Sequence, residues 1–249
     1  LIHGTGTLFN IRQQFGSTSG TAARLSPDKP YVIAFAAKKD AGATGVIRLS
    51  VKDSSGTIAN SGDFTTLLDK ARMLDLSPFD ETLFLDTDTV VLGRLDFGFR
   101  KAVDHGIACV ICECPWARRY EGLKGDLIEY NTGVLFFTRA AKPLFDAWAA
   151  CVGRVNSSIE WTESGRRHTM PYNDQAGFAK AVHDTGRAPF VLPMNWNFRP
   201  FFHRAFFGPI RIWHDYGEVP DFILRENETY RNPETRITFY PVKIGPSLR

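Results

Sequence analysis

Residues 83–92 read Leu-Phe-Leu-Asp-Thr-Asp-Thr-Val-Val-Leu, an apolar run that is interrupted by two carboxylates, Asp86 and Asp88. A buried strand is expected to carry apolar side chains, because burial of an unpaired carboxylate is costly. On an extended segment, acids at positions i and i+2 project to the same side and repel each other unless a cation or a shared proton intervenes. The stretch therefore predicts a divalent metal, magnesium or manganese, at the end of a strand. A strand that stops at Leu85, with both acids solvated in a turn, is the alternative.

The composition narrows the classes of protein to consider. The 249 residues, 43% of them hydrophobic, suit one large α/β domain or two small ones. The 30 basic and 27 acidic residues form no basic block or tail, so neither nucleic-acid nor membrane-surface binding is indicated. No apolar stretch approaches a membrane span, and no signal peptide opens the chain. The expected location is the cytoplasm, in solution or at the periphery of a membrane; removal of a natural leader stays open, because the chain begins at Leu1.

The four cysteines indicate a reducing compartment rather than a disulfide framework. They are Cys109, Cys112, Cys114 and Cys151. The first two have the C-x-x-C spacing, but residues 107–112 read as a buried strand, in which cysteine behaves as a small apolar residue. A metal or redox site is therefore not favoured at this position.

Alternating apolar patterns predict an α/β fold. Short apolar runs predict strands at residues 31–36, 46–51, 83–85, 107–112, 133–138, 190–192 and 210–213. Apolar residues at 64, 67, 68, 71 and 74 predict a helix that Asp63 caps. Pro143 opens a second helix, and Asn173 caps a third that runs to about His183. This order predicts a single domain over residues 1–249, with a mostly parallel sheet and helices on both faces, although the first 30 residues carry no clear element.

Polar residues beside these elements are candidates for a site. Lys70 flanks the apolar stripe of the first helix, so its head would emerge at the edge of a cleft unless it is an ordinary surface lysine. Gly133, at the start of a buried run, indicates either the close approach of a ligand or a bulge. Asp174, in the first turn of a helix, is stabilised by the helix dipole even without a further role. His214 follows the last apolar run, where a lone histidine is more often structural than a ligand.

The order and spacing of these residues resemble the nucleotide-sugar glycosyltransferases of the GT-A fold, most closely family 8, the group of glycogenin and of bacterial galactosyl- and glucosyltransferases. In that family a lysine on a helix precedes an Asp-x-Asp strand end by about sixteen residues, as Lys70 precedes Asp86 here. The other matches are an Asn-x-Gly before a strand (Asn131 to Gly133), an Asp-Gln pair at a helix start (Asp174 and Gln175), a Leu-Pro loop that ends on an aromatic residue and an asparagine (Leu192 to Asn197), and a histidine followed by an aromatic residue and a glycine (His214 to Gly217). The resemblance covers about residues 64–217 and thins before residue 60, where the family's first strand and nucleotide loop are not found.

The resemblance implies a metal-dependent transfer of a sugar from a nucleoside diphosphate sugar, with UDP as the nucleotide and with retention, to a carbohydrate, lipid-linked or protein acceptor. Asp86, Asp88 and His214 would hold a manganese or magnesium ion that binds both phosphates and acts as a Lewis acid. The residues implied to bind the donor are Lys70, Asn131, Gly133, Asn197 and Gly217. Those implied in catalysis are Asp174, Gln175 and Lys70.

Two other functions fit parts of the sequence. Residues 84–90 also match the opening motif of the haloacid-dehalogenase phosphohydrolases, in which Asp86 would be a nucleophile and Asp88 a general acid. That motif normally lies near the N-terminus, and no convincing Gly-Asp…Asp metal motif follows it here. A non-catalytic binder of sugar nucleotides on a transferase scaffold is the second alternative, and it is disfavoured because the matched positions are intact.

Overall fold

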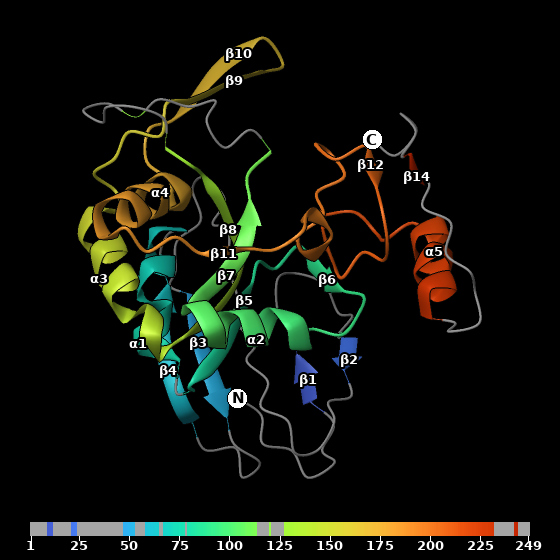
Figure 1. Ribbon diagram of the computed structural model, residues 1–249. Helices are drawn as coiled ribbons and strands as arrows, with labels where there is room; N and C mark the ends of the chain where they lie inside the picture. Colours follow the sequence, from blue (N-terminus) through green and yellow to red (C-terminus); the bar gives the residue numbers. More distant parts are fainter. Residues whose placement is uncertain are drawn as a thin grey trace.

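In this computed structural model, the described residues are 9–11, 21–23, 47–52, 58–64, 67–77, 79–113, 120, 127–231 and 242–243 (Figure 1). The strand predicted at residues 31–36 and the side chain of Cys114 lie outside them. Among the described residues, no helix is both long and apolar enough to cross a bilayer.

A four-stranded sheet forms the centre of the fold. Its strands follow the order β11 (Phe190–Val191), β7 (Ile107–Ile111), β8 (Tyr130–Thr138) and β5 (Glu81–Leu85). β11 is parallel to β7, whereas β8 is antiparallel to both of its neighbours, so three of the four strands share one direction. The predicted α/β class is confirmed. The sheet is mixed rather than built from parallel pairs. The sequence did not reveal this arrangement, because an apolar run indicates a buried strand but not the direction in which that strand runs.

Helices cover both faces of this sheet (Figure 1). One face carries η1 (Leu67–Arg72), α1 (Met73–Leu76), α3 (Lys142–Cys151) and α4 (Asp174–Thr185), and the other carries α2 (Asp96–His105). The alternation of side chains along β8 divides the core in the same way. Leu135 and Phe137 pack into the layer of α3 and α4, whereas Val134 and Phe136 pack into the layer of α2. The prediction of helices on both faces is therefore confirmed.

The predicted start of the first helix is wrong. β4 (Ile58–Phe64) pairs antiparallel with β3 (Ile47–Lys52), and this ladder extends to Phe64. Asp63 therefore lies in a strand and cannot cap a helix, and the helical segment begins only at Leu67 as a 3₁₀ turn. The other two helices begin as predicted, with Pro143 in the first turn of α3 and with Asn173 accepting a hydrogen bond from the Ala176 N–H at the start of α4.

Several elements of the fold were not predicted. They are α2, α5 (Asp221–Arg231) and the hairpin of β9 (Ile159–Glu163) and β10 (Arg166–Met170), which projects from the body of the molecule (Figure 1). β13 (Ile212–His214) overlaps the strand predicted at residues 210–213. The remaining short elements are β1 (Phe9–Ile11), β2 (Thr21–Ala23), β6 (Thr89–Val91), η2 (Arg139–Ala141), η3 (Met194–Trp196), β12 (Ala205–Phe206) and β14 (Val242–Lys243). The β9–β10 hairpin is rich in charged residues, and only Ile159 and Trp161 of β9 show the apolar alternation by which strands are recognised.

Candidate metal centre

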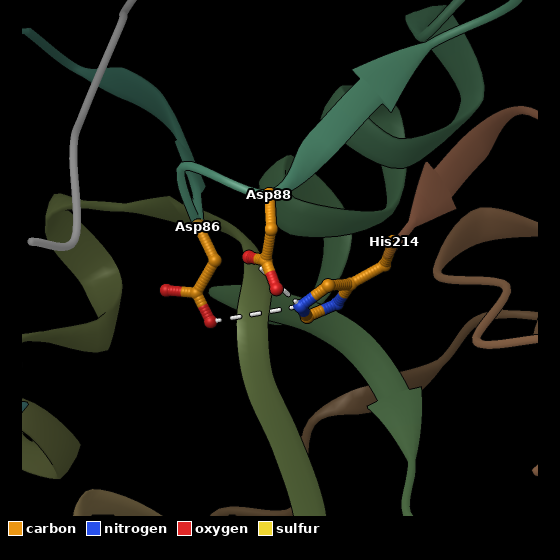
Figure 2. A group of neighbouring side chains, drawn as sticks. All are labelled: Asp86, Asp88 and His214. Atoms are coloured by element: carbon orange, nitrogen blue, oxygen red, sulfur yellow. Dashed lines mark ion pairs between the residues drawn. The ribbon is translucent and has the colours of Figure 1, made fainter. Parts of the chain in front are cut away.

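Asp86 and Asp88 lie in a tight turn after β5, and His214 at the end of β13 lies beside them (Figure 2). The Asp86 carbonyl closes the turn by accepting hydrogen bonds from the Thr89 N–H at 3.2 Å and the Thr89 hydroxyl at 2.7 Å. The turn leads into β6, which pairs with β13 so that Thr89 lies opposite His214. β5 stops at Leu85, where the predicted strand also ends, but Asp86 and Asp88 follow in a turn and not on an extended segment as expected. The turn and the pairing of β6 with β13 bring the three side chains together instead.

The three side chains form a compact group of potential ligands. One ligand atom from each lies within 4.8 Å of the others. The Nε2 of His214 lies 3.3 Å from Oδ1 of Asp88 and 3.9 Å from Oδ2 of Asp86. The exposed fractions of these side chains are 11%, 15% and 18% for His214, Asp88 and Asp86, so the acids are not simply solvated in a turn. Two carboxylates and one imidazole form a ligand set that suits manganese or magnesium.

Gly133 of β8 leaves the space that an ion would need. The β8 strand bulges here, so that residues 132–134 have no partner on β7, and the Gly133 carbonyl accepts a hydrogen bond from the Asp86 N–H at 2.8 Å. A Cβ atom at this position would lie 2.5 Å from Cε1 of His214 and 2.6 Å from Oδ2 of Asp86. The interpretation of this glycine as a bulge is confirmed, and the absence of a side chain also keeps the centre of the group open. The residues present fit a divalent ion in ligand chemistry and in space.

Lys70 is buried beside this group and is not a surface lysine. Its side chain is 6% exposed, and its Nζ lies 2.8 Å from Oδ1 of Asp86 and 3.0 Å from Oδ2 of Asp174. The better-directed hydrogen bond goes to the other oxygen of Asp86, at 3.2 Å. Asp174, in the first turn of α4, also accepts a hydrogen bond from the hydroxyl of Thr132. Lys70 thus joins the potential metal ligands to the start of α4.

The ionisable groups of the site are electrostatically coupled. Burial alone would lower the pKa of Lys70, but the carboxylates of Asp174 and Asp86 outweigh it and raise that pKa. Burial raises the pKa of Asp86, and Lys70 opposes part of this effect. Burial would also raise the pKa of Asp88, but the hydrogen bond and charge of His214 outweigh it and lower that pKa. Three carboxylates therefore surround one ammonium and one imidazole, an excess of acid that a bound cation would balance.

Asn131 and Asn197 connect to His214 through hydrogen bonds. The Oδ1 of Asn131 accepts from the Gly133 N–H at 2.9 Å and from Nδ2 of Asn197 at 2.8 Å. The Oδ1 of Asn197 lies 2.7 Å from Nδ1 of His214. The structure therefore brings two of the residues expected to bind the donor into direct or indirect contact with His214.

Gln175 contacts Glu129 and Cys112 rather than the carboxylates beside Lys70. Its Nε2 donates to Oε1 of Glu129 at 3.1 Å, and its Oε1 lies 3.8 Å from the sulfur of Cys112. Glu129 is 2% exposed and also accepts a hydrogen bond from the hydroxyl of Tyr120. Gly217 lies in an exposed turn beyond β13, so neither Gln175 nor Gly217 adds a contact to the potential metal ligands.

Two residues of the site were missed by sequence reasoning. Thr132, the central residue of the Asn-x-Gly match, binds Asp174, and Glu129 holds Gln175. Glu129 directly precedes a buried apolar strand, and an acid in such a position is the signal that singled out Asp86. The same criterion, applied to the start of a strand as well as to its end, would have found Glu129.

Comparisons with known proteins give weak similarities. No protein-family model and no curated protein matches the chain. Among solved structures, the chain is similar to mouse xyloside xylosyltransferase 1 in its apo form, with 16% identity and a TM-score of 0.40 over 62% of this chain and 64% of that one. It is also similar to the galactosyltransferase LgtC in complex with donor and acceptor sugar analogues, with 16% identity and a TM-score of 0.43 over 67% of this chain and 65% of that one. The chain thus spans less than two thirds of the length of either structure.

Proposed function

We propose that the protein is a metal-dependent glycosyltransferase that moves a sugar from a nucleoside diphosphate sugar, with UDP as the nucleotide and with retention, to an acceptor. The observation that carries this proposal is the convergence of two carboxylates and an imidazole nitrogen within 4.8 Å, around a glycine that keeps their centre open. Asp86, Asp88 and His214 would hold manganese or magnesium, which as a Lewis acid stabilises the charge that develops on a departing diphosphate.

The remaining residues of the site would hold the donor in place. Lys70 would add positive charge next to Asp86, on the side where the diphosphate would lie, and it also forms an ion pair with Asp174. Asp174 would hold donor hydroxyls or approach the reacting carbon, and the Nδ2 of Asn131 is the atom of that side chain left to donate to the sugar. Gln175 would act from the adjoining cluster, where Glu129 fixes its amide.

The phosphohydrolase alternative gains no specific support from the site. In that alternative Asp86 attacks a phosphate, and further carboxylates later in the chain complete the metal site. Within the part of the chain that the structure describes, the residue that completes the group is His214. This ligand set supports the transferase.

Replacement of Asp174 by Asn tests the proposed chemistry of the sugar. Asn preserves the size and an acceptor for Thr132 but removes the charge that would interact with the sugar in the transition state. We expect kcat for UDP release from UDP-sugars, with water as the acceptor, to fall on the order of 10²–10³-fold. The affinity for UDP should change little, since the nucleotide lies on the other side of the diphosphate.

The matched control for this variant is Asp184→Asn. Asp184 lies on the same helix, is exposed and pairs with Lys180 at 2.6 Å, so its replacement should leave kcat unchanged. If Asp174 only stabilises the start of the helix and pairs with Lys70, Asp174→Asn will lower the melting temperature while turnover stays near normal. Hydrolysis of p-nitrophenyl phosphate by the wild-type protein, without release of UDP from any UDP-sugar, would instead favour the phosphohydrolase.

A further inference from the structure

We propose that Asn197 positions His214 and selects the imidazole tautomer that presents Nε2 to the metal. This inference rests on the proposed metal site and gives Asn197 a different function from the donor binding expected of it. Asn131 takes part as the residue that fixes the amide of Asn197.

The hydrogen bonds determine how the two amides are oriented. The backbone N–H of Gly133 can only donate, so the atom of Asn131 that lies 2.9 Å away is its acceptor, Oδ1. The same oxygen faces the side chain of Asn197 at 2.8 Å, so the atom of Asn197 at that position is its donor, Nδ2. The remaining polar atom of Asn197, Oδ1, therefore faces Nδ1 of His214 at 2.7 Å.

This orientation selects one tautomer of His214. An amide oxygen can only accept a hydrogen bond, so the proton must lie on Nδ1 of His214. The hydrogen bond and charge by which His214 lowers the pKa of Asp88 belong to its charged form, in which both ring nitrogens carry a proton. When that form loses the proton on Nε2, as it must to bind a metal, the neutral imidazole keeps its proton on Nδ1 and carries its free lone pair on Nε2. Nε2 is the nitrogen that faces Asp88 and Asp86, at 3.3 Å and 3.9 Å. The lone pair that a metal would need is therefore directed into the group of ligands.

The backbone holds Asn197 and His214 in this relation. Phe198, the next residue along the chain, donates its N–H to the Ile212 carbonyl at 2.9 Å and accepts from the His214 N–H at 2.8 Å. Asn197 itself is completely buried. Both of its polar side-chain atoms are used within the protein, which leaves it poorly suited to contact a donor. A fixed acceptor on the second ring nitrogen is the usual means by which proteins orient a histidine that binds a metal.

Two substitutions of Asn197 separate positioning from packing. Asn197→Asp keeps an acceptor for Nδ1 of His214 but places a carboxylate at a completely buried position, whereas Asn197→Leu has a similar size and no acceptor. If Asn197 positions His214, Mn²⁺ affinity should stay near the wild-type value in the Asp variant and fall roughly 10–100-fold in the Leu variant. If Asn197 only fills space, the Asp variant should instead be the more disturbed of the two and bind Mn²⁺ more weakly than the Leu variant. Burial of a charge costs more stability than burial of an apolar side chain.

Mn²⁺ affinity can be measured from the paramagnetic resonance signal of the free ion. Asn195→Ala is the matched control, since it removes an amide from the same segment. The Nδ2 of Asn195 donates to the carbonyls of Phe207 and Gly208 and not to His214. We expect this variant to bind Mn²⁺ as the wild type does.

The tautomer can be observed in the wild-type protein, without any substitution. Nitrogen NMR of the metal-free protein, at a pH where imidazole is neutral, should show the His214 proton on Nδ1. A proton on Nε2, or unchanged Mn²⁺ affinity in a folded Asn197→Leu variant, would overturn the inference alone. Failure of the wild-type protein to bind Mn²⁺ would overturn the proposed metal site, and the inference with it.

Discussion

Replacement of Asp88 by Ala is expected to abolish the binding of Mn²⁺ and, with it, the metal-dependent binding of UDP. Asp88 supplies the carboxylate oxygen that lies 3.3 Å from Nε2 of His214, and its loss leaves two potential ligands in place of three. The expected loss of metal affinity exceeds the roughly 10–100-fold that removal of a hydrogen-bond partner of a ligand costs. Metal-free stability should change little, because Asp88 lies in a turn rather than in the hydrophobic core.

Calorimetric titration with Mn²⁺, and with UDP in the presence of Mn²⁺, measures both effects. Asp215→Ala is the control, because Asp215 is also an acid beside His214 but lies outside the group of potential ligands. This control should bind both ligands as the wild type does. An Asp88→Ala protein that binds Mn²⁺ with unchanged affinity would show that the metal does not lie at this group.

Replacement of Lys70 by Met is expected to destabilise the metal-free protein strongly. The ammonium lies within 3.0 Å of both Asp86 and Asp174, and its removal leaves two largely buried carboxylates without their counter-charge. Loss of one partner of a buried ion pair costs about 3–5 kcal/mol of the free energy of unfolding. Unfolding in urea measures this loss, and Mn²⁺ should restore part of it because the ion replaces the missing positive charge beside Asp86.

Lys142→Met is the matched control for this prediction. Lys142 pairs with Asp146 at 2.7 Å, but both side chains are 57% exposed, so its replacement should cost only about 0–1 kcal/mol. Combining Lys70→Met with Asp174→Asn should recover part of the stability, since one unpaired charge is removed. If Lys70→Met costs no more than Lys142→Met, the ammonium does not hold the two acids together.

The parts of the fold that were predicted correctly carry strong apolar patterns. Residues 134–137 on β8 are completely buried on both faces of the sheet, and an uninterrupted apolar run is typical of such a strand. Trp148 of α3 and Phe178 of α4 belong to the apolar faces of the two helices whose starts were predicted from Pro143 and Asn173. The direction of β8 was not predictable in this way, because side-chain pattern is the same for parallel and antiparallel neighbours when both faces are buried.

The sequence revealed those residues of the candidate site whose charge lies in an apolar run. It did not reveal the contacts that depend on partners far along the chain. Asp86 and Asp88 stand out in an apolar run, whereas the position of Lys70 on a helix does not reveal that Asp174, far along the chain, pairs with it. Asp174 and Gln175 were expected to face one site because the family resemblance implies that both act in catalysis. Successive residues on an α-helix point about 100° apart, so one contacts Lys70 while the other contacts Glu129.

The most direct test of the central claim, that the protein binds a nucleotide through a divalent ion, is the melting temperature with UDP in the presence of Mn²⁺ or of a chelator. A ligand that binds only the folded state stabilises it by mass action, by about 2.7 kcal/mol at a hundred times its Kd. We therefore predict that UDP raises the melting temperature in Mn²⁺ and leaves it unchanged in the chelator. An equal increase with and without the chelator, or no increase in either, would contradict the claim.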